Sequence, residues 1–150
     1  MFPRRYVRDN SFYPLIGEVY FVNFPGTESM IKGWHPGIIC QNNLGNRYGP
    51  NVIAIPVTSK VDRLDILSNV LLPVPEVGLY HTSMAVCGSL QTVPKRAVGD
   101  FITLLPSTYM KKIARACNVA IPLIAYLSES DIKDIQNEAM ILSGHRAQMN

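Results

Sequence analysis

Residues 34–59 read WHPGIICQNNLGNRYGPNVIAIPVTS, and this stretch decides how the chain folds. Two apolar runs of strand length, 38–40 and 52–57, flank a segment rich in Asn, Gly and Pro. Polar residues that can form hydrogen bonds follow both runs, with Gln41 after the first and Thr58 after the second. Strand ends and loops held by a rigid sheet are common places for binding and catalysis, so the stretch predicts a functional site as well as two strands.

Further short strands are predicted on both sides of this stretch. Residues 18–24 are rich in β-branched and aromatic side chains and stop at Pro25, and the segments 69–74 and 84–90 follow at short intervals. Several short strands in succession favour an antiparallel barrel or a curled sheet. The polar loop 25–33 is long for a hairpin and is expected to act as a flap over a site.

Gly and Asn tolerate positive φ, so Gly45, Asn46 and Pro50 are assigned to a turn between the two central strands. The pattern changes after Pro106, where apolar residues recur at helical spacing. The predicted apolar face consists of Met110, Ile113, Ala114, Cys117, Ala120 and Ile121. Ser107 is expected to cap this helix, with Lys111, Lys112 and Arg115 on its solvated side.

A second helix is predicted over residues 130–142, with Gly144 as its stop, packed on the barrel or on a second subunit. Composition alone supports only a single α+β domain, because 150 residues with 47% hydrophobic content suffice for one core. The net charge of +3 permits a nucleic-acid partner without demanding one. No apolar run reaches the roughly 18 residues that span a bilayer, and no signal-peptide core follows Arg4, Arg5 and Arg8, so a cytoplasmic location is expected.

Cys40, Cys87 and Cys117 are isolated in apolar surroundings and are expected to be buried free thiols. The three histidines are also far apart in the sequence. No residue spacing here is typical of a metal site, and no cofactor is expected.

The central stretch resembles the MazF/PemK family of toxin endoribonucleases. The matches, in order and spacing, are Pro36, Gln41-Asn42, Gly45-Asn46-Arg47-Tyr48, Pro50 and Thr58-Ser59. Weaker similarity extends over residues 14–124, which leaves 1–13 as an N-terminal extension and 125–150 as a C-terminal helical extension.

This resemblance implies a small SH3-like antiparallel β-barrel with a C-terminal helix, acting as a homodimer, to which the chain adds a further terminal helix. It also implies a metal-independent endoribonuclease toxin that cuts single-stranded RNA by attack of the 2′-hydroxyl, leaving 2′,3′-cyclic phosphate and 5′-hydroxyl ends. A cognate antitoxin protein would be its partner.

In the family, the Arg of an Arg-Pro pair and the Thr of a Thr-Ser pair carry the main catalytic roles, and the matching positions are His35 and Thr58. Glu28 matches a loop Glu that contributes to activity in the family, or is an ordinary loop carboxylate. An imidazole in place of the guanidinium exchanges a proton near neutrality but loses the forked phosphate contact. The substitution at His35 either preserves acid/base work or marks a site that has lost activity.

RNA binding is assigned to residues on both sides of this catalytic pair. Trp34 stacks on an unpaired base or packs in a core or dimer interface. Ser59, Lys60 and Arg63 are expected to contact the phosphate backbone, and Ser89 and Gln91 to contact bases or face solvent. Residues 88–91 depart from the family pattern, so the alternatives are a catalytically silent module that binds RNA, antitoxin or another protein, and an interaction protein that uses the extra helix.

Overall fold

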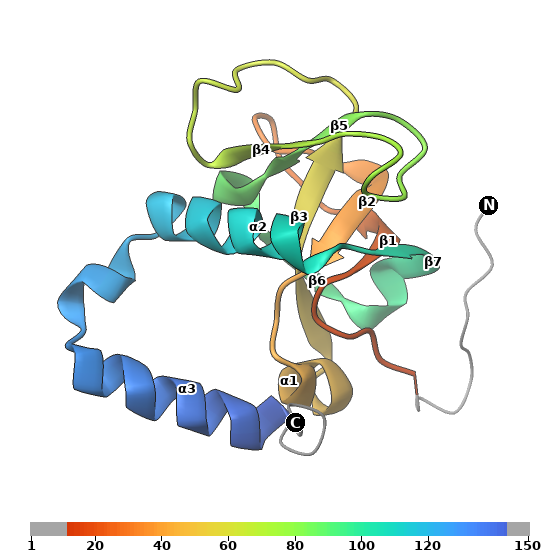
Figure 1. Ribbon diagram of the computed structural model, residues 1–150. Helices are drawn as coiled ribbons and strands as arrows, with labels where there is room; N and C mark the ends of the chain where they lie inside the picture. The colour runs from red at the N-terminus through yellow and green to blue at the C-terminus, as the bar shows by residue number, and fades with distance from the viewer. Residues whose placement is uncertain (1–11, 144–150) are drawn as a thin grey trace.

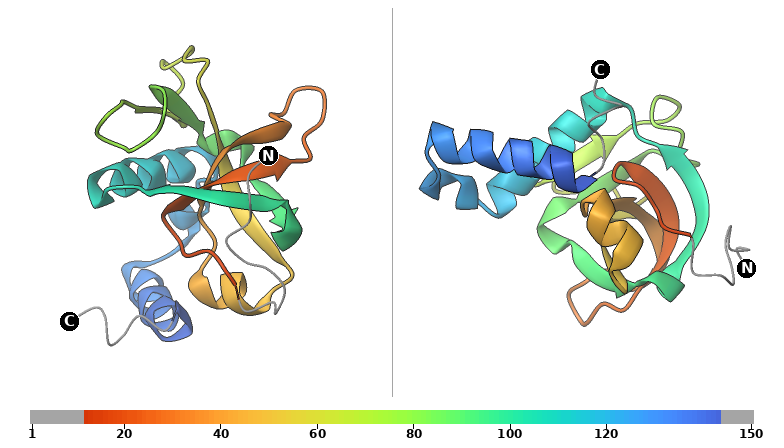
Figure 2. Two further views of the ribbon diagram at one scale, coloured as in Figure 1. Left: turned by 90° about the vertical axis from the view of Figure 1, so that its right-hand side faces the viewer. Right: turned by 90° about the horizontal axis from the view of Figure 1, so that it is seen from below.

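The β-branched and aromatic segment EVYFVNF forms β1 (Glu18–Phe24), which pairs antiparallel with β2 (Gly33–Ile39) and with β7 (Val98–Leu104). The computed structural model describes residues 12–143 (Figure 1). The remaining strands in this range are β3 (Asn51–Thr58), β4 (Asn69–Leu72), β5 (Ser83–Val86) and β6 (Gln91–Pro94). Together the seven described strands form a sheet in the order β4-β5-β3-β2-β1-β7, with β6 also paired to β3, and the sheet is strongly curled (Figure 2). The antiparallel α+β fold expected from the sequence is confirmed.

The connection between β2 and β3 differs from the predicted turn. Residues 43–48 form a short helix, α1 (Asn43–Tyr48), whose N-cap Asn42 accepts a hydrogen bond from the Gly45 amide. The buried Asn46 amide group donates to the Gln41 carbonyl at 2.9 Å. The turn assigned to Gly45 and Asn46 is therefore wrong, because side-chain caps and buried amide bonds stabilise a helical turn there.

The apolar core has two parts. One lies between the sheet and the helix over residues 107–120, and it includes Ile38, Ile55 and Leu72, each fully buried. The other lies at the opposite face of β1 and β2 and includes Tyr20, Val22 and Phe24. Each large side chain buried in this way stabilises the fold by about 1.5–3 kcal/mol, which holds the strands in one register.

The first predicted C-terminal helix is α2 (Ser107–Ala120), which lies across the sheet (Figure 1). Ile113 is buried as expected, but Ala116 and not Ala114 is the second fully covered position. Ser107 makes no capping hydrogen bond, so its predicted role is wrong; the helix begins after Pro106, which has no side-chain donor or acceptor. Lys111, Lys112 and Arg115 are exposed, as predicted.

The second helix, α3 (Glu129–Ser143), begins earlier than predicted because Ser128 and Asp131 form a reciprocal cap. It follows the short helix η3 (Leu123–Tyr126) and runs back until it packs against α1 (Figure 2). The predicted stop at Gly144 lies outside the described residues. In the range that the structure covers, no helix combines the length and apolar character needed to cross a membrane.

The segment after β4 differs most from the sequence prediction. The expected strand over residues 84–90 is the shorter β5, followed by the helical turn η1 (Cys87–Ser89). β6, the turn η2 (Lys95–Ala97) and β7 come next, and neither strand was predicted. The residues of β7 do not alternate between buried and exposed positions. The two-residue hydrophobic period that predicts a strand is therefore absent from this segment.

The three cysteines are free, but only Cys87 is buried; Cys40 and Cys117 are half-buried. They are distant in sequence, yet all three belong to or pack against the core beneath α2. Burial raises the pKa of Cys40 to about 12. A hydrogen bond from the Cys87 thiol lowers the pKa of Cys117 to about 7 and raises the pKa of Cys87.

Iodoacetamide is therefore expected to alkylate Cys117 well before Cys40 and Cys87 in the native protein at pH 7, because only the thiolate reacts. Peptide mass mapping over time measures the order of labelling. A Cys117→Ser variant should lose the fast phase alone. Equal rates at the three thiols, or fast labelling of Cys40, would contradict the assignment.

Candidate active site

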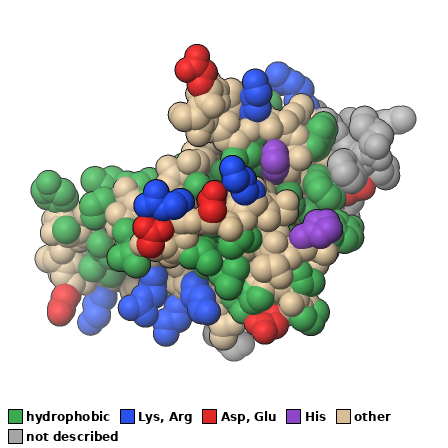
Figure 3. All heavy atoms as spheres, turned by 90° about the horizontal axis from the view of Figure 1, so that it is seen from above, with side chains coloured by type: hydrophobic (Ala, Val, Ile, Leu, Met, Phe, Trp, Pro, Cys, Tyr) green, Lys and Arg blue, Asp and Glu red, His purple; other side chains and the backbone are tan. Residues whose placement is uncertain are grey.

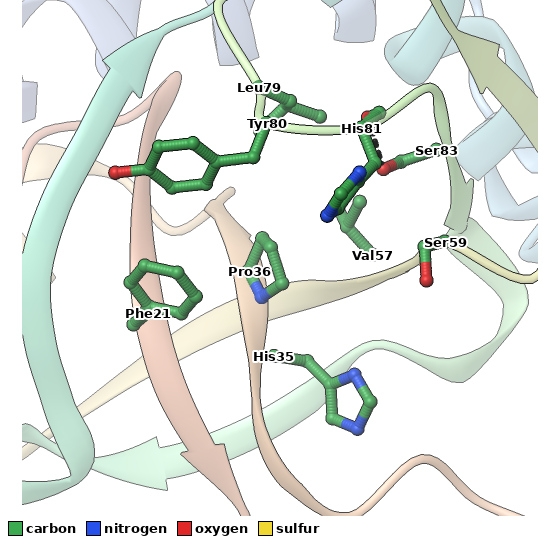
Figure 4. Close-up of a pocket in the computed structure, with 9 residues that line it drawn as sticks. All are labelled: Phe21, His35, Pro36, Val57, Ser59, Leu79, Tyr80, His81 and Ser83. Carbon is green, nitrogen blue, oxygen red and sulfur yellow. Dashed lines mark hydrogen bonds between the residues drawn. The ribbon is translucent and has the colours of Figure 1, made fainter. Parts of the chain in front are cut away.

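A pocket of about 260 Å³ lies where β1, β2, the end of β3 and the loop before β5 meet (Figure 4). His35 and Pro36 contribute from β2, and Ser59 follows the last residue of β3. Tyr80 and His81 contribute from the loop between β4 and β5. The pocket thus collects side chains from four separate segments of the chain.

The pairing of β2 with β3 ends just before the two predicted catalytic residues. The last pair of this register is Gly37 of β2 with Pro56 of β3, so His35 and Thr58 each lie two residues beyond it. This is the point where β3 leaves β2 and pairs with β5, with Thr58 opposite Met84. Thr58 itself is half-buried and lies between Val57 and Ser59, both of which line the pocket.

The His35 ring is oriented by the backbone of the loop before β2. Its Nε2 lies 3.1 Å from the Lys32 carbonyl oxygen. A carbonyl oxygen only accepts hydrogen bonds, so Nε2 carries the proton in this contact, and the neutral ring then has its lone pair on Nδ1. The arrangement presents Nδ1 of His35 as a base.

Thr58, Ser59 and Lys60 form a polar turn beside the pocket. The Lys60 amide donates to the Thr58 hydroxyl oxygen at 3.1 Å, which leaves the hydroxyl hydrogen available to a second acceptor. The Ser59 and Lys60 side chains are exposed. A phosphate oxygen is an acceptor that such hydroxyl and ammonium groups bind.

Arg63 is placed in the same exposed loop but is already paired. Its guanidinium makes two bonds of 2.9 Å to the Asp65 carboxylate, and this contact raises the pKa of Arg63 and lowers that of Asp65. Both side chains are about two-thirds exposed, at 65% and 67%. A phosphate would have to compete with Asp65 for this arginine, although an exposed pair of this kind is worth only about 0–1 kcal/mol.

Gln91 has a structural role that was not predicted from the sequence. Its side chain is only 5% exposed, accepts from the Gly26 amide and donates to the Ile31 carbonyl at 2.9 Å. Both contacts are to the loop before β2, so Gln91 ties this loop to the sheet and does not face solvent. Glu28 lies exposed in the same loop and is not among the residues lining the pocket.

Trp34 and Ser89 also lie outside the pocket lining. Trp34 is 41% exposed and packs over the backbone of β7, where an added Cβ at Gly99 would lie 2.9 Å from its ring. Neighbouring strand residues point to opposite faces, so Trp34 and His35 face different sides of β2. Ser89 is half-buried in η1.

The aromatic and imidazole side chains of the loop between β4 and β5 were missed by the sequence reasoning. Tyr80 stacks on Phe21 of β1 with ring centroids 6.2 Å apart and is 73% exposed, which offers a flat surface at the pocket. His81 adjoins it. Their signal in the sequence is a Tyr-His pair in a polar segment between two predicted strands, but nothing local relates that pair to His35.

The surface around the pocket combines imidazole rings with cations. Both histidines of the described range lie on the face shown in Figure 3, where a Lys or Arg side chain lies beside one of them. Residues 12–143 contain no group of three or more His, Cys, Asp or Glu side chains that could hold a metal ion. The fold and pocket define a small α+β protein that presents imidazoles and hydroxyls, which are groups for proton transfer and phosphate contact.

Residues 16–121 match the family model described as the PemK-like, MazF-like toxin of type II toxin–antitoxin systems. The chain therefore belongs to this family. It is 27% identical over 111 residues to the endoribonuclease EndoA of Bacillus subtilis, which covers 73% of this chain and 96% of the relative.

Solved structures agree with this assignment. An endoribonuclease in complex with its cognate antitoxin, from a mycobacterial species, is 28% identical, with a TM-score of 0.61 over 73% of this chain and 96% of that one. The MazF structure from Deinococcus radiodurans has a TM-score of 0.65 over 74% of this chain and 98% of that one, at 16% identity, and so supports the fold.

Proposed function

We propose that the protein is a metal-independent endoribonuclease toxin that cuts single-stranded RNA. The 2′-hydroxyl of the RNA itself attacks the neighbouring phosphate, which leaves 2′,3′-cyclic phosphate and 5′-hydroxyl ends. The observation that carries the proposal is the pocket lined by His35 and by Val57 and Ser59, the two sequence neighbours of Thr58. Membership of the family and the endoribonuclease relatives support it.

The proposed roles follow from the groups at the pocket. His35 removes the 2′-hydroxyl proton through Nδ1, and the Thr58 hydroxyl donates to a phosphate oxygen as charge develops on it. Ser59 and Lys60 hold the backbone phosphate, joined by Arg63 when it leaves Asp65. The exposed Tyr80 ring stacks on a base, an interaction worth about 1–3 kcal/mol.

Three predicted residues would act from the edge of this site. Glu28 would contact the RNA from its exposed loop, and Trp34 and Ser89 would contact bases beyond the scissile bond. A cognate antitoxin and a second copy of the chain complete the proposal, and the antitoxin-bound relative supports the first of these partners.

The test is incubation of the purified protein with mixed single-stranded RNAs in excess chelator, alongside His35→Ala and Thr58→Ala. We expect fragments with 2′,3′-cyclic phosphate ends in the wild type and their loss in both variants. Cleavage that stops in chelator, or that persists in both variants, would contradict the metal-independent mechanism or the site assignment.

A specific observation favours one other candidate, a module that binds RNA or antitoxin without cutting. His35 lacks the permanent charge of the family arginine, and Arg63 is already engaged by Asp65. This candidate predicts RNA binding without cleavage by the wild type, and gain of cleavage by His35→Arg. Cleavage by the wild type excludes it.

A further inference from the structure

His81 lies in an anchored part of the loop between β4 and β5. The buried Ser83 hydroxyl donates to the His81 carbonyl at 2.7 Å, and the Thr82 hydroxyl accepts from the Val74 amide at 3.2 Å. In the middle of the loop, Gly78 has a φ of 73° and fits against Thr103 of β7 so closely that an added Cβ would meet the threonine side chain at 2.5 Å. The backbone around His81 is therefore held, while its imidazole remains exposed.

This anchoring places the His81 ring on the same pocket as the His35 ring. Figure 4 shows the two imidazoles on opposite sides of Pro36 and Val57, with Ser59 beside them. Of the residues that line the pocket, His35, His81 and Tyr80 are the ones that titrate, and the lining contains no carboxylate. Lys60 directly follows the lining residue Ser59 in the sequence and has an exposed side chain.

The proposed RNA cleavage needs a general acid as well as a general base. One group must accept the 2′-hydroxyl proton, and another must protonate the departing 5′-oxygen, because an alkoxide is a poor leaving group. The Lys32 carbonyl sets the His35 tautomer that suits the base. Thr58 is too weak an acid to supply the other proton, since a hydroxyl holds its proton far above neutral pH.

We propose that His81, as the imidazolium, is the general acid that protonates the departing 5′-oxygen. The inference rests on the proposed function. In the step, the 2′-oxygen–phosphorus bond forms as His35 takes the 2′-proton, and the phosphorus–5′-oxygen bond breaks as His81 gives up its proton. The products are the cyclic phosphate and the 5′-hydroxyl, and the two imidazoles return to their starting states by proton exchange with water.

The test uses two versions of one oligoribonucleotide that contains a cleavage site mapped with the wild type. One has the ordinary linkage, and the other has sulfur in place of the bridging 5′-oxygen, because a thiolate leaves without being protonated. We expect His81→Ala to lose about 10²–10⁴-fold in cleavage rate on the ordinary linkage and to approach the wild-type rate on the sulfur linkage. His35→Ala should stay slow on both linkages.

His81→Gln, which keeps a polar side chain, provides a second variant if His81→Ala disturbs the loop, and thermal unfolding of each variant checks the fold. Unchanged cleavage in both His81 variants, or equal loss on the two linkages, would overturn the inference while the ribonuclease assignment stands. If the wild type cuts no RNA, so that no cleavage site can be mapped, the proposed function itself fails, and this role of His81 fails with it.

Discussion

Replacing His35 by alanine is expected to lower the rate of RNA cleavage by about 10²–10⁴-fold, the usual contribution of a positioned general base. The imidazole is half-buried at the pocket, its Nε2 is held by the Lys32 carbonyl, and Nδ1 is the atom left to accept a proton. Alanine removes this base at a half-buried position, so the fold is expected to be kept. Single-turnover cleavage of a mapped oligoribonucleotide measures the loss.

The matched comparison is His35→Arg, which restores the family residue with its charge and forked phosphate contact. We expect this variant to bind RNA more tightly and to cut at a rate between those of the wild type and His35→Ala. Unfolding curves of the three proteins should coincide within about 0.5 kcal/mol, as for surface substitutions generally. Wild-type cleavage by His35→Ala would remove His35 from the mechanism.

Gly37→Ala is expected to reduce the free energy of unfolding by about 1–3 kcal/mol, the usual cost of overpacking a core. An added Cβ would lie 2.9 Å from the Phe24 ring and 2.9 Å from a Val22 methyl. Both neighbours are buried in the second apolar cluster, so neither can swing into solvent. Because Gly37 lies two residues from His35 in β2, the shift is also expected to displace His35 and to lower the rate of RNA cleavage.

Urea unfolding measures the first effect and RNA cleavage the second. Gly88→Ala is the matched control, since its added Cβ would meet only the Ser68 hydroxyl at an ordinary 3.5 Å. The control should change stability by less than about 0.5 kcal/mol. Equal stability of Gly37→Ala and Gly88→Ala would mean that the strands adjust to a larger residue at this crossing.

The family, the central strands and the helical C-terminal region could be predicted from local patterns. Runs such as residues 18–24 and 52–57 have strand composition, and the ordered matches from Pro36 to Ser59 specify the family. His35 and Thr58 could be paired because each lies in a matched motif. Local signals failed at α1, where buried side-chain amides outweigh the turn preference of Gly45 and Asn46.

The central strands, the helical C-terminal region and the family could be predicted from the sequence, because they depend on residue type and spacing along the chain. Other features became visible only in the folded chain. The Gln91 side chain holds a loop by hydrogen bonds, Arg63 is paired with Asp65, and the three cysteines, which are isolated in the sequence, share one core. The fold also places His81 in the same pocket as His35. The physical reason is that antiparallel pairing and loop packing bring together residues that are far apart in sequence, and composition carries no record of which loop closes over which strand.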